Sequence, residues 1–350
     1  MAESSLPGDK KTEKLFDVLS VGNAMVDILV KTNDEFLQSL KLKKGSMNLI
    51  DEAKAKILFD LFAKVEKSSS ASVNEMSGGC AANVSAGISS FGGKAAFLGL
   101  ISKDECGERF LEKLRCRDVN VESSPMKDKG ETGRCLIIVT EDGARTMCTY
   151  LGSLQDISPE DIKEDVIAKS KIVFISAFLL DCKSGKEVML KVMEFAKKND
   201  CKIAITLSDS LCVKRHKAVL MDFIDNHVDL FFGNKEEINE LLSSSSHEES
   251  VNMMVKKYAG KDKIAVLTCS KDGVIIVGKD GPITVGGQEV AKVVDTTGAG
   301  SVFVSGFLYA YTHNFDLEQA AKLGNIAAAK CLSHLGARPI TSLRSLLASI

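Results

Sequence analysis

The sequence lacks several patterns that would assign it to an unrelated class of protein. Its ten cysteines form no Cys-x-x-Cys pair, which argues against zinc and against a disulfide framework. No apolar run is long enough to span a membrane, and the polar start has no signal-peptide core. A formal net charge of −2 gives no electrostatic reason to expect nucleic acid or a membrane as partner. We therefore expect a cytoplasmic protein with reduced thiols and a flexible polar tail over residues 1–15.

The order of predicted elements indicates the fold class. After residue 152, short β-branched or aromatic runs alternate with helical stretches, which is typical of a parallel sheet covered by helices on both faces. Two segments, 24–50 and 120–152, break this alternation and predict a small sheet over the carboxyl ends of the main strands, where open α/β folds bind ligands. We therefore predict one α/β domain over residues 16–350, with these two segments as its smaller sheet.

Residues 295–301 read Asp-Thr-Thr-Gly-Ala-Gly-Ser and lead into an apolar stretch that continues to Tyr311. Gly298 and Gly300 flank Ala299 where a helix is expected to begin. A glycine-rich turn that opens a helix leaves backbone N–H groups unpaired at the positive end of the helix dipole, which makes a phosphate site. The glycine spacing is that of neither a P-loop nor a dinucleotide-binding turn, which excludes a dinucleotide-dependent oxidoreductase.

This turn strongly resembles the C-terminal motif of the ribokinase-like (PfkB) family of sugar and nucleoside kinases, Asp-Thr-x-Gly-Ala-Gly-Asp. In that family the final Asp is the general base that deprotonates the acceptor hydroxyl. Ser301 occupies this position here, and a neutral hydroxyl is a poor proton acceptor near pH 7. Rapid turnover would then need another carboxylate within reach, such as Asp295 or Asp209.

The resemblance extends over about residues 16–345 and looks closest to the adenosine-kinase-like members. It implies a ribokinase-like three-layer sandwich, with a central, mostly parallel sheet and a small β-sheet lid. It also implies ATP and Mg²⁺ as cofactors, and a nucleoside or a sugar as the small-molecule substrate.

Two segments match the residues with which the family holds its substrate. Asn23 and Asp27 follow the first predicted strand, and an ionised carboxylate suits substrate binding because it can accept from two hydroxyls at once. Gly78 and Gly79 precede Asn83 in the pattern Gly-Gly-x-x-x-Asn, in which paired glycines let the backbone approach a ligand closely. Taken alone, both segments are also consistent with turns or helix caps that bind nothing.

Other matches concern the nucleotide and the metal. Asn234 and Glu237 form the family pattern Asn-x-x-Glu, which implies nucleotide phosphates near Asn234 and Mg²⁺ at Glu237. One Glu is chemically reasonable, because Mg²⁺ keeps most of its waters, although the same two residues also make a good helix cap without a ligand. The resemblance places Thr268, Gly273 and Asn325 at the nucleotide, and Asn325 is equally consistent with simple helix packing.

Two functions stay open at this stage. The first is an ATP- and Mg²⁺-dependent kinase of a nucleoside or sugar, adenosine first, with low activity because Ser301 replaces the base. The alternative is a catalytically dead pseudokinase that acts as a structural or regulatory subunit, with a protein partner or a homodimer formed through the lid. Arg145 lies in the predicted lid and is either a phosphate ligand or an ordinary surface arginine.

Overall fold

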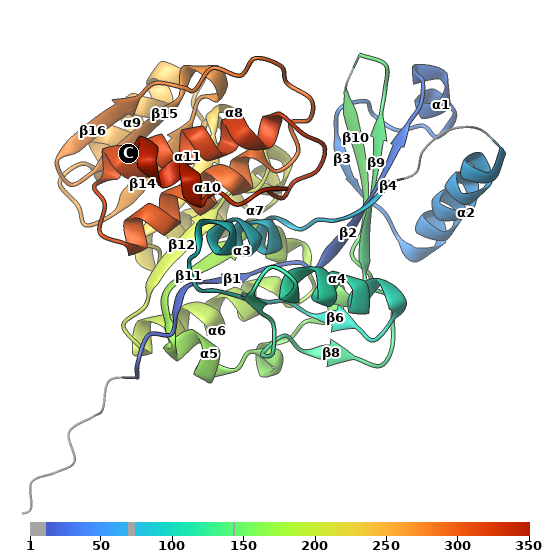
Figure 1. Cartoon of the computed structure of the whole chain (residues 1–350), viewed down its shortest axis with the longest axis horizontal. Coiled ribbons are helices and arrows are strands. Elements are labelled where there is room, and N and C mark those ends of the chain that lie inside the picture. Colours follow the sequence, from blue (N-terminus) through green and yellow to red (C-terminus); the bar gives the residue numbers. More distant parts are fainter. Residues whose placement is uncertain (1–11, 69–73, 143) are drawn as a thin grey trace, which may run out of the picture.

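The structure, a computed structural model, describes residues 12–68, 74–142 and 144–350. Most of the tail predicted over residues 1–15 lies outside the described residues. The chain forms a large α/β body with a smaller sheet and two helices beside it (Figure 1). Within the described part, no helix combines the length and the apolar composition needed to cross a membrane.

The body is built on a central sheet in which the described residues form nine strands. Strands β14 to β11, β1, β5 and β7 pair in parallel, and β15 and β16 add an antiparallel edge. The inner strands are almost completely buried, as expected for a sheet covered on both faces. In spatial order the strands are β16 (Gly281–Val285), β15 (Val274–Gly278), β14 (Ile264–Thr268), β13 (Leu230–Asn234), β12 (Lys202–Thr206), β11 (Ser170–Ser176), β1 (Phe16–Val21), β5 (Ala95–Leu98) and β7 (Val119–Asn120).

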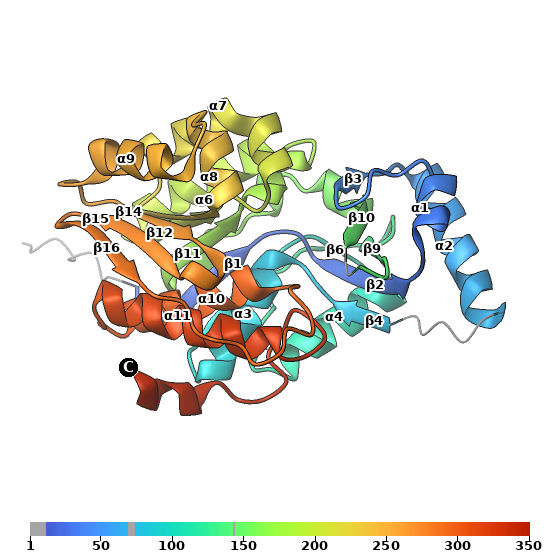
Figure 2. The same cartoon turned by 90° about the horizontal axis from the view of Figure 1, so that it is seen from above.

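Helices cover both faces of the central sheet. Figure 2 shows α3, α10 and α11 on one face and α6 to α9 on the other. Helix α10 is apolar along almost its whole length because it packs between α3 and α11. The helices of the body are α3 (Cys80–Phe91), α4 (Glu105–Arg115), α5 (Glu164–Ala168), α6 (Gly185–Lys198), α7 (Ser210–Asn226), α8 (Lys235–Leu242), α9 (His247–Tyr258), α10 (Ala299–Thr312) and α11 (Leu317–Leu332).

The smaller sheet is here called the lid sheet. Successive side chains on its strands point to opposite faces, one toward the body and one toward α1 and α2. On β9, Cys135 and Ile137 face the body, whereas Leu136 and Ile138 join a separate hydrophobic cluster under helices α1 and α2. The two helices lie on the outer side of this sheet (Figure 1). In spatial order the lid elements are β3 (Met47–Leu49), β10 (Arg145–Tyr150), β9 (Gly133–Val139), β2 (Met25–Lys31) and β4 (Asn74–Ser77), with α1 (Asp34–Ser39) and α2 (Glu52–Ser68) outside.

These elements confirm the predicted α/β fold with a central, mostly parallel sheet and a small β-sheet lid. Two details differ from the sequence prediction. Segment 24–50 contains a helix as well as strands, and β4 joins the lid sheet from outside both predicted segments. Strand β4 has no alternation of apolar and polar residues, so only its pairing with β2 identifies it. Because α1 and α2 cover the outer face, the predicted contact of a partner through the lid stays a prediction.

Candidate active site

A cavity of about 460 Å³ lies between the lid sheet and the carboxyl ends of the central strands. Five neighbouring strands each place a polar residue at this edge: Asn23 after β1, Ser176 on β11, Thr206 on β12, Asn234 on β13 and Thr268 on β14. They meet because parallel strands end at the same edge of a sheet. The size and the converging polar groups suit a small-molecule site.

Most of the residues predicted from the sequence come together at this cavity. Those that line it are Asn23, Asp27, Gly79, Asn83, Asn234, Glu237, Thr268, Gly298, Gly300 and Ser301. Gly78 lies behind Asp27, and Ala299 belongs to the first turn of α10. Gly273 forms the turn between β14 and β15, and Asn325 donates from Nδ2 to the Gly286 carbonyl at 2.9 Å. The structure therefore keeps Gly273 and Asn325 away from the cavity lining, and their nucleotide contacts stay a prediction.

The turn that begins α10 forms one end of the cavity. Gly298 has a φ of +80°, and a Cβ there would lie 2.5 Å from backbone atoms of Ala337, so only glycine fits. A Cβ at Gly300 would meet no atom within 4 Å, so this position opens onto free space. The first N–H groups of a helix have no acceptor within it, and they carry the positive end of the dipole. The turn is thus an open cradle that fits a phosphate group.

Ser301 lies in the first turn of α10, beside this cradle, and its hydroxyl contacts the thiol of Cys80. Its Oγ donates to Sγ of Cys80 at 3.3 Å. Burial raises the pKa of the Cys80 thiol to about 11, and the hydrogen bond from Ser301 only partly opposes this rise. Both side chains are therefore neutral at pH 7, and neither can serve as a general base.

Asp295 and Asp209 are the two carboxylates that could replace the missing general base, and their surroundings differ. Asp295 does not line the cavity, and its oxygens already accept from Thr297 N at 2.6 Å and Gly336 N at 3.0 Å. Burial alone would raise the pKa of Asp295, but these hydrogen bonds and the charge of Arg145 outweigh it and lower the pKa. Asp209 does line the cavity, and burial raises its pKa. Asp209 also caps α7, because its Oδ1 accepts from Cys212 N at 2.5 Å. Asp209 is still the better candidate for the base, because it faces the cavity and Asp295 does not.

Asp27 and Gly79 line the part of the cavity next to the turn that begins α10, here called the acceptor end. A Cβ at Gly78 would lie 2.1 Å from Asp27 Oδ2, and one at Gly79 would lie 2.4 Å from the Asn23 carbonyl oxygen. The glycines therefore make room for the chain's own polar groups. Burial raises the pKa of Asp27 to about 7, although the charges of Arg338 and Arg145 act against this rise.

Arg145 connects the lid to the body. It extends from β10, forms an ion pair with Asp295 and donates to the hydroxyl of Thr297. The Asp295 side chain is fully buried and that of Arg145 is 19% exposed, so this pair is well shielded from solvent. Arg145 is thus a bridge between the lid and residues 295–301, rather than an ordinary surface arginine.

The family profile of the pfkB family carbohydrate kinases matches residues 45–343. The chain belongs to this family. A probable sugar kinase from Rhizobium etli is 37% identical, with a TM-score of 0.87 over 97% of this chain and 99% of that one. An adenosine kinase from Sinorhizobium meliloti is 34% identical, with a TM-score of 0.86 over 95% and 99%. A 5-dehydro-2-deoxygluconokinase from Bacillus licheniformis is 26% identical over 332 residues, covering 92% of this chain and 91% of its own.

PfkB kinases transfer a phosphoryl group to an alcohol acceptor and generally use ATP and Mg²⁺. Asn234 and Glu237 form the reciprocal helix cap that the sequence allows, and Glu237 still faces the cavity. Burial raises the pKa of Glu237 to about 7, and the nearby charge of Asp209 adds to this effect. A dication would relieve the repulsion between these carboxylates, and Mg²⁺ needs few protein ligands. The pair therefore fits Mg²⁺.

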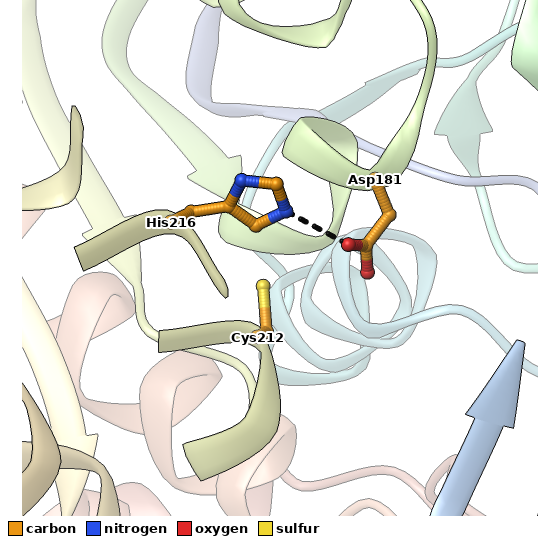
Figure 3. Close-up of side chains that lie close together, drawn as sticks. All are labelled: Asp181, Cys212 and His216. Carbon is orange, nitrogen blue, oxygen red and sulfur yellow. Dashed lines mark hydrogen bonds and ion pairs between the residues drawn. The ribbon is translucent and has the colours of Figure 1, made fainter. Parts of the chain in front are cut away.

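A second group of polar side chains lies beside the cavity. Asp181, Cys212 and His216 bring ligand-type atoms within 4.8 Å of one another (Figure 3). Each already has a partner: His216 Nε2 lies 2.8 Å from Asp181 Oδ1, Arg215 pairs with both Asp181 oxygens, and Cys212 donates to the Ala177 carbonyl. Burial raises the pKa of Cys212, which disfavours the thiolate that a metal requires. The PfkB chain thus uses this cluster as a hydrogen-bond network.

Arg338 lies in the turn after α11, in a segment that resembles the family but to which sequence reasoning assigned no role at the site. Its guanidinium donates to Asn83 Oδ1 at 2.9 Å and to the Gly78 carbonyl at 3.1 Å. The contacting residues are 255 and 260 positions apart in the sequence, and no local pattern predicts such contacts.

Proposed function

We propose that this protein is an ATP-dependent kinase of a nucleoside, with adenosine as the first candidate acceptor and a sugar as the second, and that Ser301 makes it slow. The observation that carries the proposal is one cavity lined by the open cradle of α10 and, close to it, by Asp27 and Asn83. A nucleoside is favoured by the lid side of the cavity, here called the roof. The roof is largely apolar and includes Met25, Met47, Leu49, Ile137 and Met147. An apolar roof over polar strand ends suits a flat base attached to a hydroxylated sugar.

The proposed roles follow from the chemistry of each group. Asp27 accepts from acceptor hydroxyls and orients them, and the backbone N–H groups at Gly298 to Gly300 stabilise charge on the transferring group. Glu237 with Asp209 would hold Mg²⁺, and Arg145 closes the lid against water. When bound, ATP supplies the phosphoryl group and Mg²⁺ neutralises its charge. Positioning and charge neutralisation account for most of phosphoryl-transfer catalysis, so turnover without the usual base is expected to be slow but measurable.

A second candidate function is a catalytically dead pseudokinase. One observation favours it: Ser301 and Cys80 occupy the base position as a neutral hydrogen-bonded pair. This candidate predicts that no product forms, whether the protein binds nucleotide or binds nothing.

The test is direct detection of phosphorylated product with purified protein, ATP, Mg²⁺ and a panel of nucleosides and sugars. Product detection separates transfer from simple ATP hydrolysis, and Asp27→Ala serves as the blank. Product from one acceptor, absent in the blank, would support the kinase. Acceptor and ATP binding without product would favour the pseudokinase. The absence of both binding and product would refute the kinase and leave a purely structural or regulatory subunit.

Acceptor binding is expected to weaken as pH falls through about 7. Asp27 has a pKa of about 7 because it is buried, and its protonated form cannot accept from two hydroxyls. The dissociation constant for the acceptor should therefore rise about tenfold for each pH unit below 7. Binding should be measured by calorimetry without ATP, because Glu237 titrates in the same range. A flat profile from pH 5.5 to 8.5 would show that the carboxylate does not hold the acceptor.

A further inference from the structure

Arg338 is a buried cation whose polar atoms face the back of the acceptor end of the cavity. The residue is 6% exposed, and its Cζ lies 5.6 Å from the ring centroid of Phe110. Burial lowers the pKa of the guanidinium to about 9, so it remains charged at neutral pH. Burial of such a charge lowers the stability of the fold unless other groups pair or hydrogen-bond with it.

The contact with Asn83 settles the orientation of that amide. A guanidinium only donates hydrogen bonds, so the atom 2.9 Å from Arg338 Nε must be the carbonyl oxygen of Asn83. The Asn83 NH₂ group then lies on the other side of the amide. Asn83 lines the cavity, and among the described residues no acceptor is found for its Nδ2, which is also not sealed from solvent. Asn83 can therefore donate to the cavity through its NH₂ group, while its oxygen already accepts from Arg338.

The contact of Arg338 with Gly78 supports Asp27, the hydrogen-bond acceptor of the site. Arg338 Nη2 donates to the Gly78 carbonyl at 3.1 Å, and Gly78 is the residue whose missing side chain leaves room for Asp27. The same guanidinium attracts the Asp27 carboxylate, although the two form no ion pair within the described structure. One side chain thus supports both the donor and the acceptor of this end of the cavity.

Arg338 does not line the cavity, so it has no direct contact with a bound molecule. We propose that Arg338 is a positioning residue for the acceptor: it commits Asn83 to donate while Asp27 accepts. This arrangement selects hydroxyl groups, which can donate to Asp27 and accept from Asn83, over groups that only donate or only accept. The proposal deepens the proposed kinase function and rests on it for the identity of the ligand.

Arg117 offers a matched control. It is also an arginine that supports the turn after α11, because its Nη1 donates to the Pro339 carbonyl at 2.9 Å. It contacts neither Asn83 nor Gly78 through any hydrogen bond in the described structure. Arg117→Met therefore tests support of the turn alone, whereas Arg338→Met also removes the two contacts at the cavity.

The experiment is a double-mutant cycle on adenosine binding, measured by calorimetry. Arg338→Met and Asn83→Ala should each weaken binding at least about tenfold, as expected when a buried polar group loses its partner. Because Arg338 acts through Asn83, the double variant should bind much more tightly than the product of the two losses predicts. Arg117→Met should change binding less than twofold and combine additively with Asn83→Ala. Additive losses for Arg338→Met, or unchanged binding, would overturn the proposal.

Two further measurements cover other failures. Should Arg338→Met not fold, Arg338→Lys keeps the charge but can satisfy only part of the geometry, and an intermediate affinity is expected; wild-type affinity would overturn the proposal. Should wild-type protein bind no nucleoside or sugar, the kinase function fails, and the ligand-free protein still tests the contact. The Arg338 Nε–H signal in NMR should exchange slowly with water and lose this protection in Asn83→Ala. Fast exchange in the wild type would overturn the positioning role by itself.

Discussion

Replacement of Ser301 by aspartate is expected to raise the turnover number by about 10²–10⁴-fold, the usual contribution of a general base. Ser301 lies in the first turn of α10 and lines the cavity, and this turn has no acidic residue at present. A carboxylate at the N-terminal end of a helix interacts favourably with the dipole, so Ser301→Asp should fold normally. The measurement is the rate of phosphorylated product with saturating ATP, Mg²⁺ and the acceptor identified by the panel.

The control for this variant is Ser301→Asn, which has nearly the same shape but cannot take a proton. Only the aspartate should accelerate turnover, and it should do so with little change in KM, because the base acts on the proton in the transition state. Equal gains from both variants would attribute the effect to shape. No gain from either, with acceptor and ATP still bound, would show that the cradle itself has lost its catalytic geometry.

Replacement of Asp27 by asparagine is expected to lower kcat/KM at least about 100-fold, because hydrogen bonds to charged groups are strong and the amide would point an NH₂ group at the acceptor. The same change should stabilise the fold at high pH. Burial raises the folded-state pKa of Asp27 from 3.8 to about 7, so folding stability is lost as pH rises through this window. Asp27→Asn should thus melt at a higher temperature than the wild type at pH 8, with the difference shrinking towards pH 4.

Asp142→Asn is the matched control, since Asp142 is an exposed lid aspartate paired with Lys44. It should leave kcat/KM unchanged at every pH. Activity retained in Asp27→Asn, together with lower stability at pH 8, would mean that Asp27 supports the structure rather than the acceptor.

Sequence reasoning was most successful where a function depends on a short contiguous segment. The turn over residues 295–301 and the pair Gly78–Gly79 carry their geometry locally, because a positive φ or a missing Cβ can be satisfied only by glycine. The alternation of strands and helices likewise predicted the parallel sheet, whose topology then gathers the strand ends at one edge.

What the sequence could not supply are the contacts between distant segments. The Arg145–Asp295 pair spans 150 residues, and Arg338 reaches Asn83 across 255. Both depend on how the lid and the last turn are placed on the body, and an arginine in a loop gives no local signal of its partner. The glycine pair also had a role that the sequence alone assigned differently, because the group that needs the space is Asp27.

The hydrophobic cluster beneath α1 and α2 has a further consequence for access to the cavity. It is separate from the core of the body, so the lid sheet carries an interior of its own. The inner face of the lid sheet, by contrast, belongs to the core of the body through Met25, Cys135 and Ile137. Opening of the lid would break the Arg145 bridge and the ion pair of Glu75 on β4 with Arg109 on α4. It would also expose the roof, while the packing under the two helices would stay intact. Admission of a substrate would therefore disturb the inner face of the lid sheet and leave the cluster on its outer face in place.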